Sequence, residues 1–485
     1  MRFVYICNNI KEMYMQKFME RGVKSFLWGV LGLLLLSACK GDDEVETLSD
    51  EGTNDWIYRV MEAYYLWYED IPEKANLNFS QSPDRFFESL ISEQDGVMFD
   101  GKWIPFSTIE QKDNTTKTVT ASDSYGFEYA IFQDSKYYYA WVLYVLPGSP
   151  AAEAGIKRGD WIIAIGSDIP NVTNTAVFRQ GAATTFQLAD ATVEGKTVVF
   201  SRREQVEIDA SRAVEDTPFL KDSVYTIDGT SVGYLLYNGF TSGPNDEGDA
   251  YDEQMKEIFA RFKAEQVREF VLDLRYNQGG LVTSAQLLTS FLAPAEALGK
   301  TFCYIDYSKK QEDKNREELL YKNSQLGNAN LDLDRLFVLT GSTTASASEA
   351  VINCLIPYLG RENIIIIGEK TIGKRVGSNV FGSKEKYDWL LHPIVLRIYN
   401  ANRQADYANG FVPDVELKEL RVGNKLYPFG DINELLLKEA ISQMTGQQVM
   451  KSKILQGVAD EEILLKPSFL KGRVKGLVDN NDNIE

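Results

Sequence analysis

The pattern of apolar and polar positions predicts one buried strand–helix–strand unit with particular clarity. Leu336 to Leu339 is an apolar run of strand length, and a turn rich in Gly, Ser and Thr follows it. The segment 349–359 is apolar on most sides and long enough for a helix, and 363–368 is a second apolar run. Strands joined in this way pair in parallel, so both end at the same edge of one sheet. Open α/β sheets place their functional sites at that edge.

Helical spacing of aromatic and aliphatic residues marks the chain from residue 55 onward. Trp56, Val60 and Tyr64 belong to this series, and a second helix is expected to start at Ser82 with Pro83 in its first turn. We interpret the pattern as a small, packed helical domain over 55–117 that holds no cofactor.

Residues 1–38 are interpreted as a signal peptide and left out of the fold prediction. Basic residues precede an apolar run of 11 residues, Phe26 to Leu36, which is too short to span a bilayer. The following Ser-Ala-Cys39 resembles a bacterial lipobox, with Cys39 as the lipidated first residue of the mature chain. The alternative is an ordinary signal peptide with an incidental cysteine. We expect an acidic tether over 39–54 and a lipid-anchored protein of the bacterial cell envelope, at the outer membrane and facing either the periplasm or the surface.

Charge and composition exclude several classes of function. Without residues 1–38, which hold five of the 51 basic and two of the 70 acidic side chains, the formal charge is −22. Such an acidic chain is a poor partner for nucleic acid. The single histidine, His392, excludes an H-E-x-x-H zinc site, and it lies in a predicted strand where we interpret it as structural. No C-x-x-C spacing occurs among the four cysteines, so we expect neither a metal nor another cofactor.

Two candidate reactive residues follow the C-terminal ends of the predicted parallel strands. Ser346 follows the first strand and Lys374 the second, so the fold can bring them together although 28 positions separate them. Each has a simpler interpretation. Ser346-Ala-Ser-Glu349 has the spacing of a helix capping box, and a single lysine is usually a solvated surface residue.

A third stretch favours the functional interpretation of these residues. The predicted strand 270–274 runs into Gly279-Gly280. Because glycine has no side chain, backbone N–H groups at such a pair can approach a substrate closely. Two N–H donors in that position form an oxyanion hole.

Four motifs in this order resemble those of the C-terminal processing peptidases, also called tail-specific proteases. The similarity covers about 55–446 and implies a serine endopeptidase that cleaves unfolded or C-terminally recognised polypeptides through an acyl-enzyme. It implies Ser346 as nucleophile, Lys374 as base, and the N–H groups of Gly280 and Ala347, or of Gly279, as oxyanion donors. The motifs are Asp273-Leu-Arg275-x-Asn277-x-Gly279-Gly280, Thr344-Ala-Ser346-Ala-Ser348-Glu349, Gly373-Lys374 and Gly410-Phe-Val-Pro413-Asp414.

The sequence departs from the family pattern at one catalytic position. The family usually has a glutamine four positions after the lysine, where it orients the amine, and this chain has Ser378 there. A hydroxyl can make one hydrogen bond to the amine, but its side chain is shorter. The separation between Ser346 and Lys374 is also slightly longer than the family's.

Residues 118–206 resemble a PDZ domain. The resemblance implies that Gly126, Phe127, Glu128 and Tyr129 form a loop that captures the C-terminal carboxylate of a polypeptide, while a strand edge pairs with its backbone. This loop differs from the commonest Gly-Leu-Gly-Phe form. The alternative is a structural spacer that binds nothing.

The expected fold is therefore a multi-domain α/β protein. After the helical N-terminal domain comes the PDZ domain, which is β-barrel-like, and then a Ser-Lys peptidase core of ClpP/crotonase-like type over 207–420. A C-terminal helix and tail occupy 421–485. The competing hypothesis is a non-catalytic, membrane-tethered receptor whose PDZ domain binds tails and whose α/β body is a scaffold.

Overall fold

The computed structural model describes residues 49–99, 101–111, 123–134, 137–170, 175–194, 197–244, 248–314, 317–382, 388–446 and 477–478. Cys39 and the signal peptide lie outside the described residues. Among the helices within these ranges, none combines the length and the apolar character that a membrane crossing requires.

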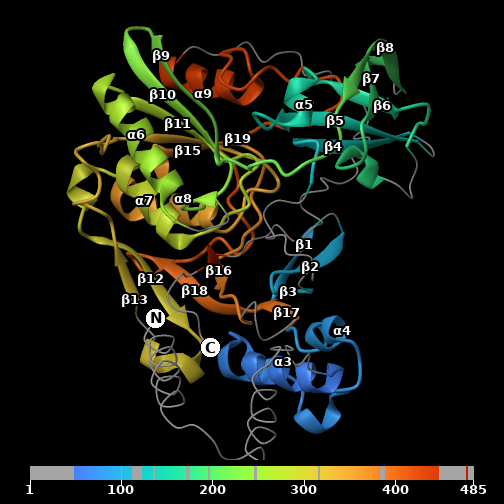
Figure 1. The fold of residues 1–485 in the computed structure, drawn as a ribbon. Helices are drawn as coiled ribbons and strands as arrows, with labels where there is room; N and C mark the ends of the chain where they lie inside the picture. Colours follow the sequence, from blue (N-terminus) through green and yellow to red (C-terminus); the bar gives the residue numbers. More distant parts are fainter. Residues whose placement is uncertain are drawn as a thin grey trace, which may run out of the picture. The chain divides into compact units, whose positions relative to one another are not determined.

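The α/β core, expected over 207–420, contains a six-stranded sheet in the order β19-β15-β14-β11-β10-β9 (Figure 1). All neighbouring strands are parallel except β9, which pairs with β10 in antiparallel fashion. The predicted strand–helix–strand unit is confirmed as β14, α8 and β15, with Leu336 opposite Ile364 in the parallel register. The strands are β9 (Phe219–Ile227), β10 (Thr230–Tyr237), β11 (Glu269–Asp273), β14 (Leu336–Thr340), β15 (Ile364–Gly368) and β19 (Val415–Glu416).

Helices cover both faces of this sheet, which explains why its strands are apolar at nearly every position. Leu235 and Leu272 face α6 (Ala250–Ala264), α7 (Val282–Leu292) and α8 (Ala347–Leu359) in one core. Tyr234 and Val271, one position earlier on each strand, face α9 (Leu435–Thr445) in another. Figure 1 shows α9 on the opposite side of the sheet from α7 and α8. The C-terminal helix expected within 421–485 is α9.

A second sheet joins the core to the N-terminal domain. Its order is β13-β12-β18-β16-β20, and the Ile394 N–H of β18 donates to the Ser107 hydroxyl of the N-terminal domain at 2.8 Å. Figure 1 shows β3 beside β17, and these two strands pair in antiparallel fashion. The strands are β3 (Thr108–Gln111), β12 (Thr301–Tyr307), β13 (Glu317–Leu320), β16 (Val376–Ser378), β17 (Trp389–His392), β18 (Ile394–Asn400) and β20 (Leu477–Val478).

The N-terminal domain is less helical than the sequence predicts. Helices α3 (Asp50–Tyr64) and α4 (Pro83–Glu88) are present, and Ser49 caps α3 by accepting from the Gly52 N–H at 3.3 Å. A hairpin of β1 (Gly96–Phe99) and β2 (Lys102–Pro105) follows, and then β3. These strands have only four residues each, too few to show a period of two.

The PDZ domain is a five-stranded antiparallel sheet in the order β4-β5-β6-β7-β8, with the short helix α5 (Pro150–Glu153). One face packs on the domain's own core around Phe186, and the other packs with Tyr276 of the α/β core and Leu426 of the C-terminal segment. The strands are β4 (Phe127–Asp134), β5 (Tyr137–Val145), β6 (Trp161–Ile165), β7 (Thr184–Glu194) and β8 (Thr197–Ile208).

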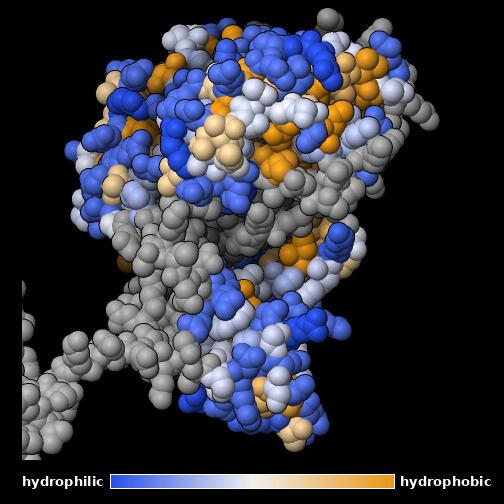
Figure 2. Space-filling model, turned by 45° about the vertical axis from the view of Figure 1, so that its right-hand side comes forward, coloured by the Kyte–Doolittle hydropathy of each residue, from blue (hydrophilic) through white to orange (hydrophobic). Residues whose placement is uncertain are grey.

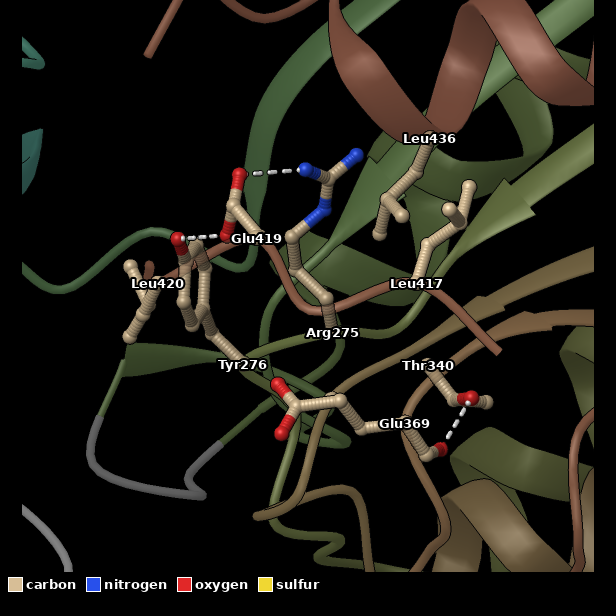
Figure 3. A pocket seen from close by; sticks show the side chains of 9 residues that line it. Arg275, Tyr276, Thr340, Glu369, Leu417, Glu419, Leu420 and Leu436 are labelled. Atoms are coloured by element: carbon tan, nitrogen blue, oxygen red, sulfur yellow. Dashed lines mark hydrogen bonds and ion pairs between the residues drawn. The ribbon is translucent and has the colours of Figure 1, made fainter. Parts of the chain in front are cut away.

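Arg158 links the PDZ domain to a buried charge cluster around Arg275. Its guanidinium donates to Glu419 and, at 3.0 Å, to the Tyr276 hydroxyl. Figure 3 shows Glu419 between Arg275 and Tyr276, and Arg275 also donates to Glu434 at 2.7 Å. Burial by itself raises the pKa of Glu419, but the two guanidinium charges outweigh it and lower that pKa to about 2. The cluster holds the backbone that leads directly into Gly279-Gly280.

Hydrophilic side chains cover most of the face shown in Figure 2, with smaller apolar areas between them. The exposed large apolar side chains of the described residues include Met98 and Trp103, which pair across the β1–β2 hairpin.

Candidate active site

Ser346 occupies a sharp turn between β14 and α8. It is the residue before the first turn of α8, with φ 60° and ψ −116°, and only 1% of its surface is exposed. A positive φ is uncommon for a residue with a side chain and costs about 1–3 kcal/mol. Strained serines on strand-to-helix turns are a recurrent way to present a nucleophile at the end of a sheet. The Ser346 Oγ is buried, and beyond the Glu349 N–H of the capping box it has no hydrogen-bond partner within the described residues.

Gly279 and Gly280 lie directly against this turn. A Cβ on Gly279 would be 2.7 Å from the Ser346 Cβ and 3.1 Å from its Oγ. A Cβ on Gly280 would be 2.0 Å from the Phe240 carbonyl oxygen. Both glycines also have positive φ angles, 109° and 138°. Space and conformation therefore both require glycine here, as the sequence interpretation of a close backbone approach expects.

The three candidate oxyanion donors differ in what their N–H groups already bind. The Gly279 N–H donates to the Asn277 side-chain oxygen at 2.8 Å. For the N–H groups of Gly280 and Ala347, no acceptor occurs among the described residues. Ala347 is also the first residue of α8, where the helix dipole favours negative charge. Gly280 and Ala347 are thus available to an oxyanion, whereas Gly279 supplies the space beside Ser346.

Lys374 lies in the segment between β15 and β16, and only 1% of its surface is exposed. Its Nζ has no hydrogen-bond partner within the described part of the chain and lies 5.2 Å from the centre of the Phe106 ring. Burial lowers the pKa of Lys374 to about 8, and the Asp95 and Glu349 carboxylates oppose this decrease. The simpler interpretation of Lys374 as a solvated surface lysine is therefore wrong.

A single carboxylate brings the two candidate residues together. One oxygen of Glu349 accepts from the Ser346 N–H at 2.9 Å and from the Lys374 N–H at 2.8 Å. The sum of these distances, 5.7 Å, is the upper limit for the separation of the two backbone nitrogens. The other oxygen accepts from the Gly373 N–H at 2.7 Å and from the Thr371 hydroxyl. Burial raises the pKa of Glu349 to about 7, against the lowering effect of these donors.

Glu349→Gln is expected to lower kcat by about 10²-fold with little loss of folded protein. The amide keeps the size of the side chain, but its NH₂ group replaces one oxygen and faces N–H donors. The resulting repulsion displaces Ser346 or Lys374, and a displacement of about 1 Å can lower the rate by about 10²-fold. Steady-state kinetics on an unfolded protein substrate measures this decrease in kcat. The matched control is Glu257→Gln on α6, where the side chain is exposed. An equal kcat for Glu349→Gln and the wild type would contradict the positioning role of Glu349.

Neither Ser378 nor Ser348 makes a hydrogen bond to the Lys374 amine. Ser378 ends β16 opposite Ile394, is buried, and makes no hydrogen bond to Lys374. The Ser348 hydroxyl donates to the Asn277 carbonyl at 3.1 Å. The charged groups that face the amine are Glu349 and Asp95, and sequence reasoning missed Asp95 because it belongs to no motif and lies far from Lys374 along the chain.

The PDZ loop residues lie at the start of the edge strand β4. Gly126 has a φ of 82° and precedes Phe127, Glu128 and Tyr129, the first three residues of the strand. The Gly126 N–H donates to the Ser124 hydroxyl at 2.8 Å. This loop amide is therefore already engaged within the domain, while the outer edge of β4 has no neighbouring strand in the described sheet.

Within the described residues, no group of three His, Cys, Asp or Glu side chains is arranged to hold a metal ion. The chemistry available at the site comes from a serine, a lysine of lowered pKa, two backbone N–H donors and two buried carboxylates.

Comparisons with known proteins agree on the domains. Residues 231–417 match the model of Peptidase family S41, 52–108 that of the Peptidase S41 N-terminal domain, and 141–168 that of a PDZ domain. A solved structure from Bacteroides fragilis NCTC 9343, assigned to the S41 proteases, is 34% identical with a TM-score of 0.72, and the match covers 81% of this chain and 97% of that one.

Two curated relatives are similar over shorter stretches. The carboxyl-terminal-processing protease of Picosynechococcus sp. (strain ATCC 27264 / PCC 7002 / PR-6) is 25% identical over 64% of this chain and 67% of its own. The carboxy-terminal-processing protease of Bartonella bacilliformis is 30% identical over 47% of this chain and 46% of its own. The matches thus span about half to two thirds of these relatives.

Proposed function

The chain belongs to peptidase family S41 and is a serine-type peptidase, and from that premise we propose that Ser346 is its nucleophile and Lys374 its general base. One observation carries this assignment. The Lys374 Nζ is buried without a hydrogen-bond partner in the described residues, and the buried Ser346 Oγ has none there beyond the capping-box N–H of Glu349. The backbones of both residues share one Glu349 oxygen. Buried polar atoms normally have partners, and those that lack them are candidates for a catalytic role.

The proposed reaction is a two-step acyl transfer. Neutral Lys374 accepts the Ser346 proton while Oγ bonds to the carbonyl carbon, and the N–H groups of Gly280 and Ala347 stabilise the oxyanion. The C–N bond then breaks, the amine leaves with the proton from Lys374, and an ester on Ser346 remains. Water hydrolyses this ester, with Lys374 again as base. A base with a pKa of about 8 is neutral in a useful fraction near pH 7–8.

The proposed substrates are polypeptides that are unfolded or recognised at their C-terminal ends. The outer edge of β4 supports this, because an extended chain can add to an exposed strand edge through backbone hydrogen bonds. The engaged Gly126 N–H is a reason to expect that strand addition contributes more than carboxylate capture.

A labelling and digestion experiment tests the proposal against the receptor hypothesis. The protein is treated with a fluorophosphonate probe, and mass spectrometry locates the modified residue. An unfolded protein is then digested, and its new termini are sequenced by mass spectrometry. Label on Ser346 together with new termini supports the peptidase. Binding of the unfolded protein with no cleavage and no label would favour a tail-binding receptor.

We also propose that Cys39 carries a lipid anchor in the cell envelope. The apolar run and the Ser-Ala-Cys39 sequence support it, and Cys39 lies outside the described residues. Metabolic labelling with an alkynyl fatty acid tests it, since Cys39→Ser is expected to abolish both the label and membrane fractionation. Equal labelling of the two forms would rule the anchor out.

A further inference from the structure

A buried carboxylate of the N-terminal domain, Asp95, acts electrostatically on the Lys374 amine. Asp95 has no exposed surface, and its oxygens accept from the Tyr65 hydroxyl at 2.8 Å, from the Ser107 N–H at 3.1 Å and from the Ser107 hydroxyl. All these donors are neutral, and Asp95 takes part in no ion pair found within the described residues. Burial raises the pKa of Asp95, and its hydrogen-bond donors and the charge of Lys374 oppose this rise and favour the carboxylate. A buried carboxylate without a direct cationic partner is costly, so its presence here calls for an explanation.

Phe106 connects Asp95 to Lys374. The Phe106 N–H donates to the Asp95 carbonyl at 3.2 Å, and its ring lies under the Lys374 Nζ. The adjacent Ser107 binds the Asp95 carboxylate through both its N–H and its hydroxyl. Asp95, Phe106 and Ser107 thus form one buried unit against the amine, which we call the N-terminal wall.

The N-terminal wall also lies beside Ser378. The Ser107 hydroxyl accepts from the Ile394 N–H at 2.8 Å, and Ile394 is the cross-strand partner of Ser378. Ser378 stands where the family pattern has a lysine-orienting glutamine. The N-terminal wall therefore places polar groups near Ser378, where this chain lacks the glutamine of the family pattern.

We propose that Asp95 is the positioning residue of Lys374 and takes over the role that the family pattern gives to a glutamine at the position of Ser378. This inference rests on the proposed function of Lys374 as base. The negative charge attracts the protonated amine and holds its side chain at the sheet edge between turnovers. The N-terminal domain then completes the active site instead of serving only as a packed cap.

The charge of Asp95 also adjusts the strength of the base. The groups that face the Lys374 amine are Asp95 from the N-terminal domain and Glu349 from α8, and Tyr65 in turn faces Asp95. Burial disfavours the ammonium, and the two carboxylates offset part of that effect. Without Asp95 the lysine would be neutral over a wider pH range but would be a weaker base and less well placed.

The pH dependence of kcat/KM tests the proposal with Asp95→Asn, which keeps the shape of the side chain. In the wild type the rate is expected to rise with pH to a plateau, with a midpoint at about 8. Asp95→Asn is expected to move this midpoint to lower pH by about one unit and to lower the plateau. Asp70→Asn is the matched control, since Asp70 is a carboxylate of the same domain bound to Ser92 and does not face Lys374. A lower plateau with an unmoved midpoint would mean that Asp95 is merely structural, and would overturn the proposal.

A stability cycle provides a readout that does not depend on activity. Melting temperatures are measured for the wild type, Asp95→Asn, Lys374→Met and the double variant. If the two charges attract each other, the double variant is more stable than the sum of the single shifts predicts. If Asp95→Asn alone does not fold while the double variant does, that result also shows the coupling. Additive shifts would overturn the proposal even for an active enzyme. Equal activity of Ser346→Ala and the wild type would instead contradict the proposed function.

Discussion

Replacing Ser346 by alanine is expected to lower kcat/KM for an unfolded protein by about 10⁴-fold or more, because no other group in the site can form the acyl-enzyme. The residual rate would come from the two oxyanion donors and from substrate binding. The fold should lose only about 1 kcal/mol, since the Ser346 Oγ has no partner in the described residues beyond the capping-box N–H of Glu349 and alanine is the smaller side chain. A fluorogenic unfolded protein, followed at pH 8 over enzyme concentrations that span four decades, measures the loss.

Ser348→Ala is the matched control, two positions away in the same turn. Its hydroxyl donates to the Asn277 carbonyl, so alanine should cost about 1 kcal/mol of stability and at most about 10-fold in activity. If Ser348→Ala abolished activity and Ser346→Ala retained it, the nucleophile would have been assigned to the wrong serine. If both variants kept full activity, the serine mechanism itself would be excluded.

The peptidase core was predictable from the sequence because its signals are local and strong. Strands covered by helices on both faces become continuous apolar runs, as in 336–339 and 363–368, and the helix between them forces a parallel pairing. Because the two strands are parallel, Ser346 and Lys374, which follow their C-terminal ends, must lie at the same edge of the sheet. Gly279 and Gly280 could also be identified, since paired glycines after a strand indicate a close backbone approach.

The roles of the Glu349 and Asp95 carboxylates were not predictable from the sequence. The sequence offered the capping box at Glu349 as an alternative to catalysis at Ser346, yet the structure shows that the two are compatible. Glu349 binds the Ser346 N–H as a capping residue does, and the same oxygen also binds the Lys374 N–H. Asp95 reaches Lys374 only through packing between domains, and no local pattern encodes such a contact. The short strands β1 to β3 were missed because four residues show no clear periodicity.

Lys374→Met is expected to give an enzyme that is about 10²–10⁴-fold less active, which is the range for loss of a general base. In the wild type, kcat/KM should rise with pH through a midpoint at about 8, because only neutral Lys374 can accept the Ser346 proton. Lys374→Arg should also be inactive, and at every pH, since a guanidinium stays protonated. Initial rates between pH 6 and 10 measure all three proteins. Substantial activity of Lys374→Arg would mean that another group is the base.

Lys374→Met is also expected to stabilise the fold. This gain in stability distinguishes a buried catalytic lysine from a surface lysine. The folded-state pKa of about 8 lies below the unfolded value of about 10.4, so the unfolded chain binds the proton more tightly. The free energy of unfolding of the wild type should therefore rise with pH from about 8 to about 10.4, and this rise should be absent in Lys374→Met. Below pH 8 the methionine variant should be more stable by about 3 kcal/mol, from about 1.36 kcal/mol per pKa unit. Urea unfolding at pH 7 and at pH 10 measures both values, and equal stabilities of the two proteins at pH 7 would mean that the Lys374 amine is solvated and cannot act as the proposed base.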